Sequence, residues 1–136
     1  MENNQSREMG KGIHIISNLY ECKRPEYLVD KKKLEALLTK TIQENELTVL
    51  RKDFHKFVPE GVDEEENRLY GMTGYMLLAE SHVSIHTWPD RENYIAMDIF
   101  VCNYSKDNRE NAMKIYHSLL DSFQPTRKEE YFIPRN

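Results

Sequence analysis

The feature that most constrains the fold is a strict alternation of side chains over residues 94–102. Every second position there holds a large apolar residue, namely Ile95, Met97, Ile99 and Val101. The positions between them are also mostly apolar, and Asp98 is the charged exception. A period of two is typical of a β-strand, and apolar residues on both sides indicate a well-covered, central strand. We therefore predict a sheet with this segment near its middle.

Weaker patterns of the same kind predict further strands. Stretches rich in β-branched and aromatic residues, bounded by Pro, Gly or charged runs, are typical of strands. We expect them over residues 12–22, 47–57, 74–79 and 82–87, with a short last strand over residues 131–133. The charged stretch 63–68 is interpreted as an exposed loop, and residues 1–9 as a frayed arm.

Two segments have helical periodicity. The first runs from residue 31 to about residue 45, with Asp30 as its N-cap. Its apolar residues fall on one face: Leu34, Leu37, Leu38 and Ile42. The second is expected to begin at Ser105 or Asp107 and to stop at Pro125. Its apolar stripe consists of Met113, Tyr116, Leu120 and Phe123.

This order of elements predicts a single α+β domain over residues 1–136. Consecutive strands without helices between them favour a mainly antiparallel sheet, and two amphipathic helices would cover one face of it. The fold expected is a two-layer α/β sandwich. The second face of the sheet also needs cover, and a second copy of the chain in a homodimer is one way to provide it.

Composition excludes some classes of function. The formal net charge is −4, whereas nucleic-acid binding needs a concentrated basic face, so we expect no nucleic-acid partner. No apolar run reaches the ~20 residues that span a bilayer, and the polar start lacks a signal peptide. Cys22 and Cys102 are interpreted as reduced thiols. We therefore expect a cytoplasmic protein without a membrane partner.

The densest group of polar side chains lies in residues 80–90. Alternation places His82, Ser84 and His86 on one face of a strand. His82 and His86 are four residues apart, but four residues of a strand span about 13 Å, so they cannot share one zinc ion and we expect no metal. No G-x-S-x-G motif surrounds Ser81 or Ser84, which disfavours a serine hydrolase. Taken singly, the histidines are interpreted as hydrogen-bonding groups of a half-buried strand.

Taken together, residues 80–89 (ESHVSIHTWP) resemble the processing-site segment of prokaryotic S-adenosylmethionine decarboxylases. The resemblance continues on both sides of this segment. Residues 12–22 are similar to the opening strand of the family, residues 54–62 to its second strand and turn, and residues 96–102 to the strand with its catalytic cysteine. The likeness covers roughly residues 12–102 and fades through the last helix.

The resemblance implies an S-adenosylmethionine decarboxylase-like fold and a proenzyme, or zymogen. Autocatalytic cleavage between Glu80 and Ser81 would give chains 1–80 and 81–136, and Ser81 would become a pyruvoyl group, the only cofactor. The enzyme would be a lyase, a carboxy-lyase that holds its substrate as a Schiff base. It would convert S-adenosyl-L-methionine to decarboxylated S-adenosylmethionine and CO2 for polyamine (spermidine) biosynthesis.

The resemblance also assigns roles to other residues. His86 would be the base in processing, and Thr73 would supply a hydroxyl where relatives usually have serine. Cys102 would be the proton donor in decarboxylation, for which a thiol with a pKa near ~8.5 is suited. The substrate-binding residues would be Phe57, Val83, Trp88 and Asp90. Both halves of a homodimer would contribute.

The sequence departs from the family pattern at three places. Relatives have glutamate at the position of Asp90, one extra residue lies within 90–93, and residues 63–72 resemble an insertion. Two alternatives therefore stay open. The same machinery could act on arginine or ornithine, or the chain could be an uncleaved paralogue that regulates an active partner by dimerising with it.

Overall fold

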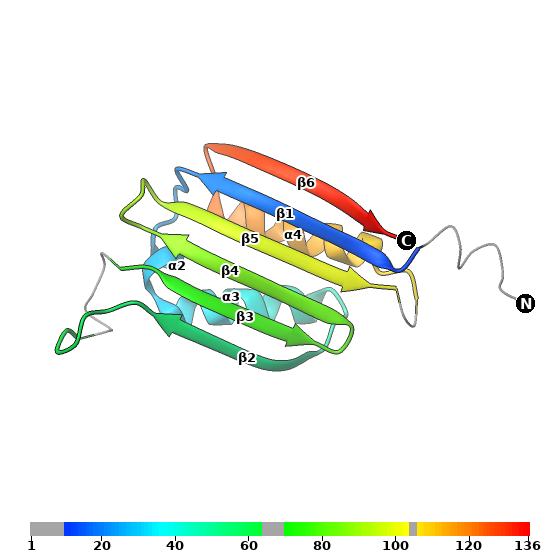
Figure 1. The fold of residues 1–136 in the computed structure, drawn as a ribbon, viewed down its shortest axis with the longest axis horizontal. Helices are drawn as coiled ribbons and strands as arrows, with labels where there is room; N and C mark the ends of the chain where they lie inside the picture. The colour runs from blue at the N-terminus through cyan, green and yellow to red at the C-terminus, as the bar shows by residue number, and fades with distance from the viewer. Residues whose placement is uncertain (1–9, 64–69, 104–105) are drawn as a thin grey trace, which may run out of the picture.

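The structure, a computed structural model, describes residues 10–63, 70–103 and 106–136. Six strands form one antiparallel sheet in the order β2-β3-β4-β5-β1-β6 (Figure 1). The strands are β1 (Gly12–Tyr20), β2 (Val49–Lys56), β3 (Met72–Leu78), β4 (Ser81–Trp88), β5 (Tyr94–Cys102) and β6 (Arg127–Arg135). The helices are α2 (Glu26–Val29), α3 (Lys31–Glu44) and α4 (Arg109–Phe123).

The predicted strands are confirmed, with one error of length. The segment 94–102 is a strand between β4 and β1, as its alternation predicted. The last strand, predicted as three residues, spans nine and pairs with β1 along its whole length. Its residues are mostly charged, so the side-chain pattern did not reveal the full length of the strand. Backbone pairing with β1 defines that length. The predicted arm at residues 1–9 and most of the loop at 63–68 lie outside the described residues.

The helices also match the prediction, with two differences. α3 begins after Asp30, whose carboxylate accepts the backbone N–H of Lys33 at 3.1 Å, as expected of an N-cap. α4 begins at Arg109, so the expected start at Asp107 is wrong, and the alternative start at Ser105 lies outside the described residues. The short helix α2 was not predicted, because four residues are too few to show a period.

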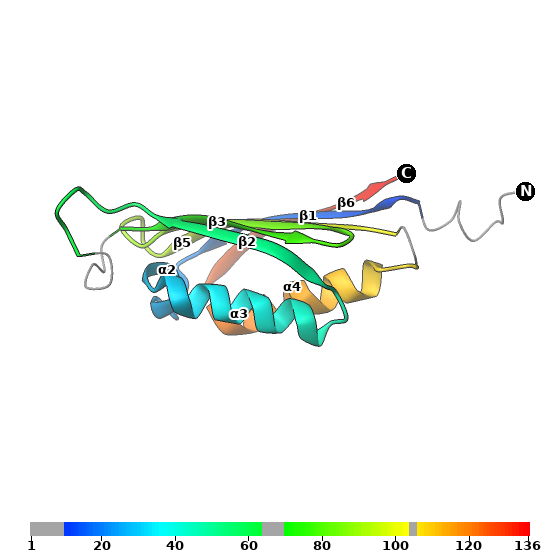
Figure 2. The ribbon, with the colours of Figure 1, turned by 90° about the horizontal axis from the view of Figure 1, so that it is seen from below.

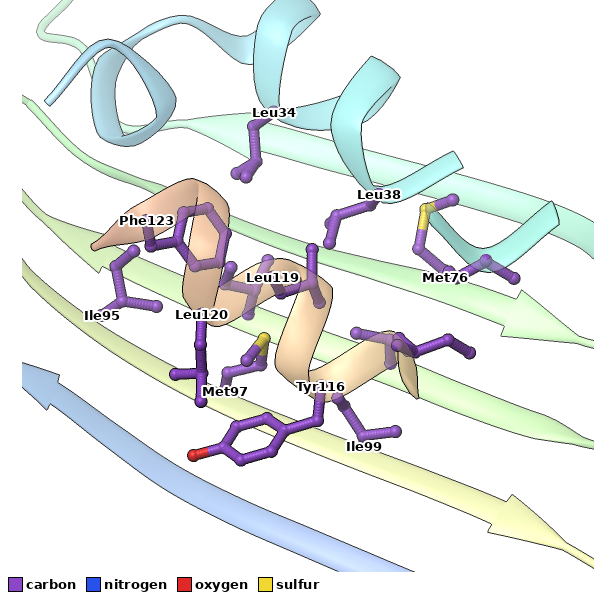
Figure 3. Packing of buried hydrophobic residues seen from close by; sticks show 14 of the residues in the cluster. Leu34, Leu38, Met76, Ile95, Met97, Ile99, Tyr116, Leu119, Leu120 and Phe123 are labelled. Carbon is purple, nitrogen blue, oxygen red and sulfur yellow. The ribbon is translucent and has the colours of Figure 1, made fainter. Parts of the chain in front are cut away.

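The core lies between the sheet and the helices. Figure 2 shows α2, α3 and α4 on the same side of the sheet, which confirms the predicted two layers. Figure 3 shows side chains of β5 packed against α4, with α3 adjacent. The alternating apolar residues of β5 are all nearly inaccessible, at 0–2% exposure. The opposite side of the same strand carries half-buried residues, because no helix of the described chain covers it.

That second side of the sheet, which we call the open face, exposes several large apolar side chains. Four of its side chains are 41–52% exposed: Tyr75, Leu77, Tyr131 and Ile133. They lie on β3 and β6, on either side of the central strands. Contiguous exposed apolar surface of this kind often marks a site of interaction with another molecule.

None of the helices in the described residues is long and apolar enough to cross a membrane.

Candidate active site

The turn between β3 and β4 brings three of the predicted residues together. Glu80 ends this two-residue turn, Ser81 begins β4, and Cys102 ends β5 beside them. The backbone N–H of Cys102 donates to the Ser81 hydroxyl oxygen at 2.6 Å and to the Glu80 carbonyl oxygen at 3.0 Å. We call Glu80, Ser81 and Cys102 the junction cluster. One N–H group therefore contacts both the carbonyl oxygen of the Glu80–Ser81 peptide bond and the hydroxyl oxygen of the serine that follows it.

A second group forms at the other end of β4. Thr73 and His86 are paired residues of β3 and β4, and the Thr73 hydroxyl lies 2.5 Å from Nε2 of His86. The His86 ring is exposed on the open face, with its centre 5.3 Å from that of Trp88 and 6.5 Å from that of Phe57. We call Phe57, Thr73, His86 and Trp88 the histidine cluster. The contact with Thr73 fixes the orientation of an imidazole that is otherwise open to solvent.

The two clusters are far apart within one chain. Ser81 and His86 are five residues apart on the same strand, which corresponds to ~17 Å along it. A side chain cannot bridge that distance. The structure thus brings Ser81 to Cys102 and Thr73 to His86, but it does not bring the predicted base to the predicted serine within one chain.

Three of the four predicted substrate-binding residues lie at the histidine end. Phe57 follows β2 with 46% exposure, Trp88 ends β4, and Asp90 is exposed in the β4–β5 turn. Val83 differs from these three, because its side chain is fully buried on the side of the sheet that faces the helices, and its role in substrate binding stays a prediction. Alternation had placed it opposite His82 and His86, and the core occupies that side.

Sequence reasoning missed a row of aromatic rings that extends this cluster across the sheet. The Trp88 ring lies 5.2 Å from that of Tyr94, which lies 5.1 Å from that of Tyr20. The Arg127 guanidinium covers Tyr20 at 3.8 Å from the ring centre. Burial, and the charge of Glu129, raise the pKa of Tyr94. These residues are distant in sequence, so only strand pairing reveals the row.

The two histidines of β4 lie in different surroundings. His82 and His86 lie on the same exposed side of β4 with Ser84 between them. His82 packs against Phe100, with ring centres 5.7 Å apart. The described ranges contain no group of three His, Cys, Asp or Glu side chains that could hold a metal ion.

The chain is similar to known proteins over most of its length. The family model described as S-adenosylmethionine decarboxylase matches residues 13–136. A protein of Archaeoglobus fulgidus named S-adenosylmethionine decarboxylase proenzyme is 33% identical over 124 residues, which are 91% of this chain and 96% of that protein. One of Hydrogenobaculum sp. with the same name is 31% identical over 124 residues, 91% of this chain and 81% of that protein.

A solved structure supports the fold. The crystal structure of the adenosylmethionine decarboxylase from Aquifex aeolicus superposes with a TM-score of 0.75 at 24% identity, covering 93% of this chain and 92% of that chain. The family match extends well past the first 102 residues and includes α4 and β6, where the likeness was not visible by inspection. The chain thus belongs to the S-adenosylmethionine decarboxylase family, whose curated members are named as proenzymes.

Proposed function

We propose that this chain is a self-processing, pyruvoyl-dependent decarboxylase of S-adenosylmethionine. Its product, decarboxylated S-adenosylmethionine, would supply polyamine synthesis, and the relatives' shared name supports this substrate. The observation that carries the proposal is the junction cluster. A serine follows the bond to be cut, and one N–H contacts both its hydroxyl oxygen and the carbonyl oxygen of the bond.

The proposed cleavage proceeds through an ester intermediate. The Ser81 hydroxyl oxygen attacks the Glu80 carbonyl carbon, the C–N bond breaks, and the acyl group moves to oxygen as an ester. Removal of the Cα proton of residue 81 then expels the Glu80 carboxylate and leaves dehydroalanine. Water replaces the nitrogen, which departs as ammonia. The Cys102 N–H is placed to stabilise negative charge on the Glu80 carbonyl oxygen during the attack.

We propose that the base for elimination comes from a second copy of the chain. His86 has a ring suited to proton transfer near neutral pH, but its own Ser81 is ~17 Å away along β4. We propose a homodimer in which two open faces stack, related by a two-fold axis near Ser84 and perpendicular to the strands. Since Ser84 lies midway between the clusters, this axis places each His86 and Thr73 over the partner's junction cluster.

The apolar character of the open face supports this arrangement. Stacked sheets pack about 10 Å apart and bury the side chains between them. The exposed residues Tyr75, Leu77, Tyr131 and Ile133 would be removed from water by such packing. The histidine cluster and the Cys102 side chain would then lie in a closed space between the sheets, over the end of β4 that begins with Ser81.

In the mature enzyme, a pyruvoyl group at position 81 would supply a ketone that serves as electron sink for the loss of CO2. The junction cluster places Cys102 beside residue 81, since the Cys102 N–H contacts the Ser81 hydroxyl oxygen before the bond is cut. Cys102 would hold the proton that is returned to the substrate carbon. Phe57 and Trp88 would stack on the adenine ring, and the Asp90 carboxylate would accept hydrogen bonds from the ribose.

We also propose that the enzyme works in the cytoplasm. A reducing compartment would keep the thiol of Cys102 available for proton transfer, and both Cys22 and Cys102 are free in the structure.

The test combines intact mass with turnover. The purified protein is expected to contain a chain of residues 1–80 and a chain 81–136 that is lighter by one ammonia than a chain with an intact serine. Labelled S-adenosylmethionine is expected to release CO2, and arginine and ornithine are not. A single uncut chain would refute self-processing, whereas cutting with CO2 released only from arginine or ornithine would refute the substrate.

A further inference from the structure

Asn108 is a buried amide that contacts the junction cluster. Its side chain comes from the residue just before α4 and has 0% exposure. Its Nδ2 donates to the Glu80 carboxylate and, at 3.0 Å, to the Cys102 carbonyl oxygen. Its Oδ1 accepts from the Asn111 side chain at 3.3 Å. The amide therefore donates to two residues of the junction cluster, Glu80 and Cys102.

This side chain does not serve the start of the helix. Asn108 occupies the N-cap position, where an oxygen acceptor normally satisfies a helix N–H, yet its side chain makes no capping hydrogen bond. The Asp107 carboxylate instead accepts the backbone N–H of Arg109 at 3.0 Å. A fully buried amide needs partners, and the acceptors of this one, on Glu80 and Cys102, lie outside α4.

The contacts close a ring of hydrogen bonds around Glu80. Cys102 donates its N–H to the Glu80 carbonyl oxygen, and its own carbonyl accepts from Asn108. Asn108 then reaches back to the Glu80 carboxylate. Asn103, which is 8% exposed, accepts the backbone N–H of Asn108 at 2.9 Å and so holds the amide in place. Glu80 is thereby fixed through both its backbone and its side chain.

We propose that Asn108 is a positioning residue for self-processing, an inference that rests on the proposed function. By holding the Glu80 carboxylate against the end of β5, it fixes the Glu80 carbonyl where the Ser81 hydroxyl attacks. Orientation of this kind accounts for large rate effects, because a turn that swings freely rarely presents the carbonyl to the hydroxyl. Once the bond is cut, the same amide retains the new end of the first chain beside Cys102.

The test measures how fast each protein cuts itself after cell-free synthesis. The fraction of cut chain is determined by intact mass at successive times. Asn108→Ala is expected to slow cutting by about tenfold to a hundredfold, as for loss of a hydrogen bond to a charged group. The matched control is Asn45→Ala, which removes an amide that donates to the Thr41 carbonyl of its own helix at 2.8 Å. The control is expected to cut at the wild-type rate.

A swap of the two groups separates positioning from folding. Asn108→Asp replaces the donor with a second carboxylate beside Glu80, so it is expected to cut slowly. Adding Glu80→Gln restores an amide–carboxylate pair in reverse, and the double variant is expected to cut faster than N108D alone. This comparison holds even if N108A fails to fold, because each swap variant is checked by its circular dichroism.

The outcomes separate this inference from the function beneath it. Suppose that the wild-type protein cuts itself. If N108A then cuts equally fast, or if E80Q/N108D cuts no faster than N108D, the role of Asn108 is overturned and the proposed function is left intact. Wild-type protein that stays whole overturns the proposed function, and the inference with it.

Discussion

The separation of the two clusters along β4 gives the sharpest prediction, which concerns mixed dimers. Ser81→Ala removes the hydroxyl that attacks the bond to be cut, and His86→Ala removes the proposed base at the other end of the strand. Each variant alone is expected to stay whole. In the proposed mixed dimer, the intact Ser81 of one chain would face the intact His86 of the other, because the two ends are ~17 Å apart within a chain.

The expected yield follows from counting sites. A dimer with one S81A chain and one H86A chain has one complete site and one site that lacks both groups. Purification through two different tags isolates this mixed dimer. Its H86A chain is expected to be cut and its S81A chain to stay whole, so turnover is about half that of the wild-type dimer.

Thr73 provides a control for direction, since it belongs to the same cluster as His86. Thr73→Val is expected to slow cutting when placed on the S81A chain, which donates the working His86. On the H86A chain it is expected to have no effect. A mixed dimer in which neither chain is cut would refute the shared site, as would equal effects of T73V on both chains.

Three further predictions concern stability, each measured as the free energy of unfolding in denaturant. Gly74→Ala is expected to lower it by about 1–3 kcal/mol, because the added Cβ would lie 2.2 Å from a ring carbon of Phe54. Lys56→Met is expected to lower it by about 2 kcal/mol, since the buried ammonium donates to the Val29 carbonyl at 2.6 Å; Lys52→Met, at an exposed position on the same strand, is the control. Burial raises the pKa of the Cys22 thiol from 9.0 to about 12, so the unfolded chain ionises first and stability declines as pH rises from 9 to 12. The decline is expected to be shallower in Cys22→Ala, and an identical slope in both proteins would contradict the assignment.

The faces of the strands could be predicted from the order of the amino acids alone. A period of two sets which side chains share a face whatever surrounds the strand, so Val83 and Ile85 were separated correctly from His82 and His86. The dense run at 80–89 likewise determined the family, because many matching residues in order are specific where single residues are not. The capping role of Asp30 was also local, and it is confirmed.

The neighbours at each end of a strand could not be predicted in this way, because they depend on how the chain folds. The sequence set Ser81 and His86 in one short motif, yet an extended backbone holds them ~17 Å apart, so the motif divides between two clusters. Strand pairing brought Cys102 to Ser81 and Thr73 to His86. These contacts depend on register, which no local pattern encodes.

The same reason explains the remaining differences. β6 is a strand because β1 pairs with it, although its own residues are mostly charged. Val83 faces the core because the helices cover that side of the sheet. Asn108 gains its partners because the chain returns to the junction at the start of α4. Periodicity is a local property that a sequence displays directly, whereas contacts between distant segments exist only once the chain has folded.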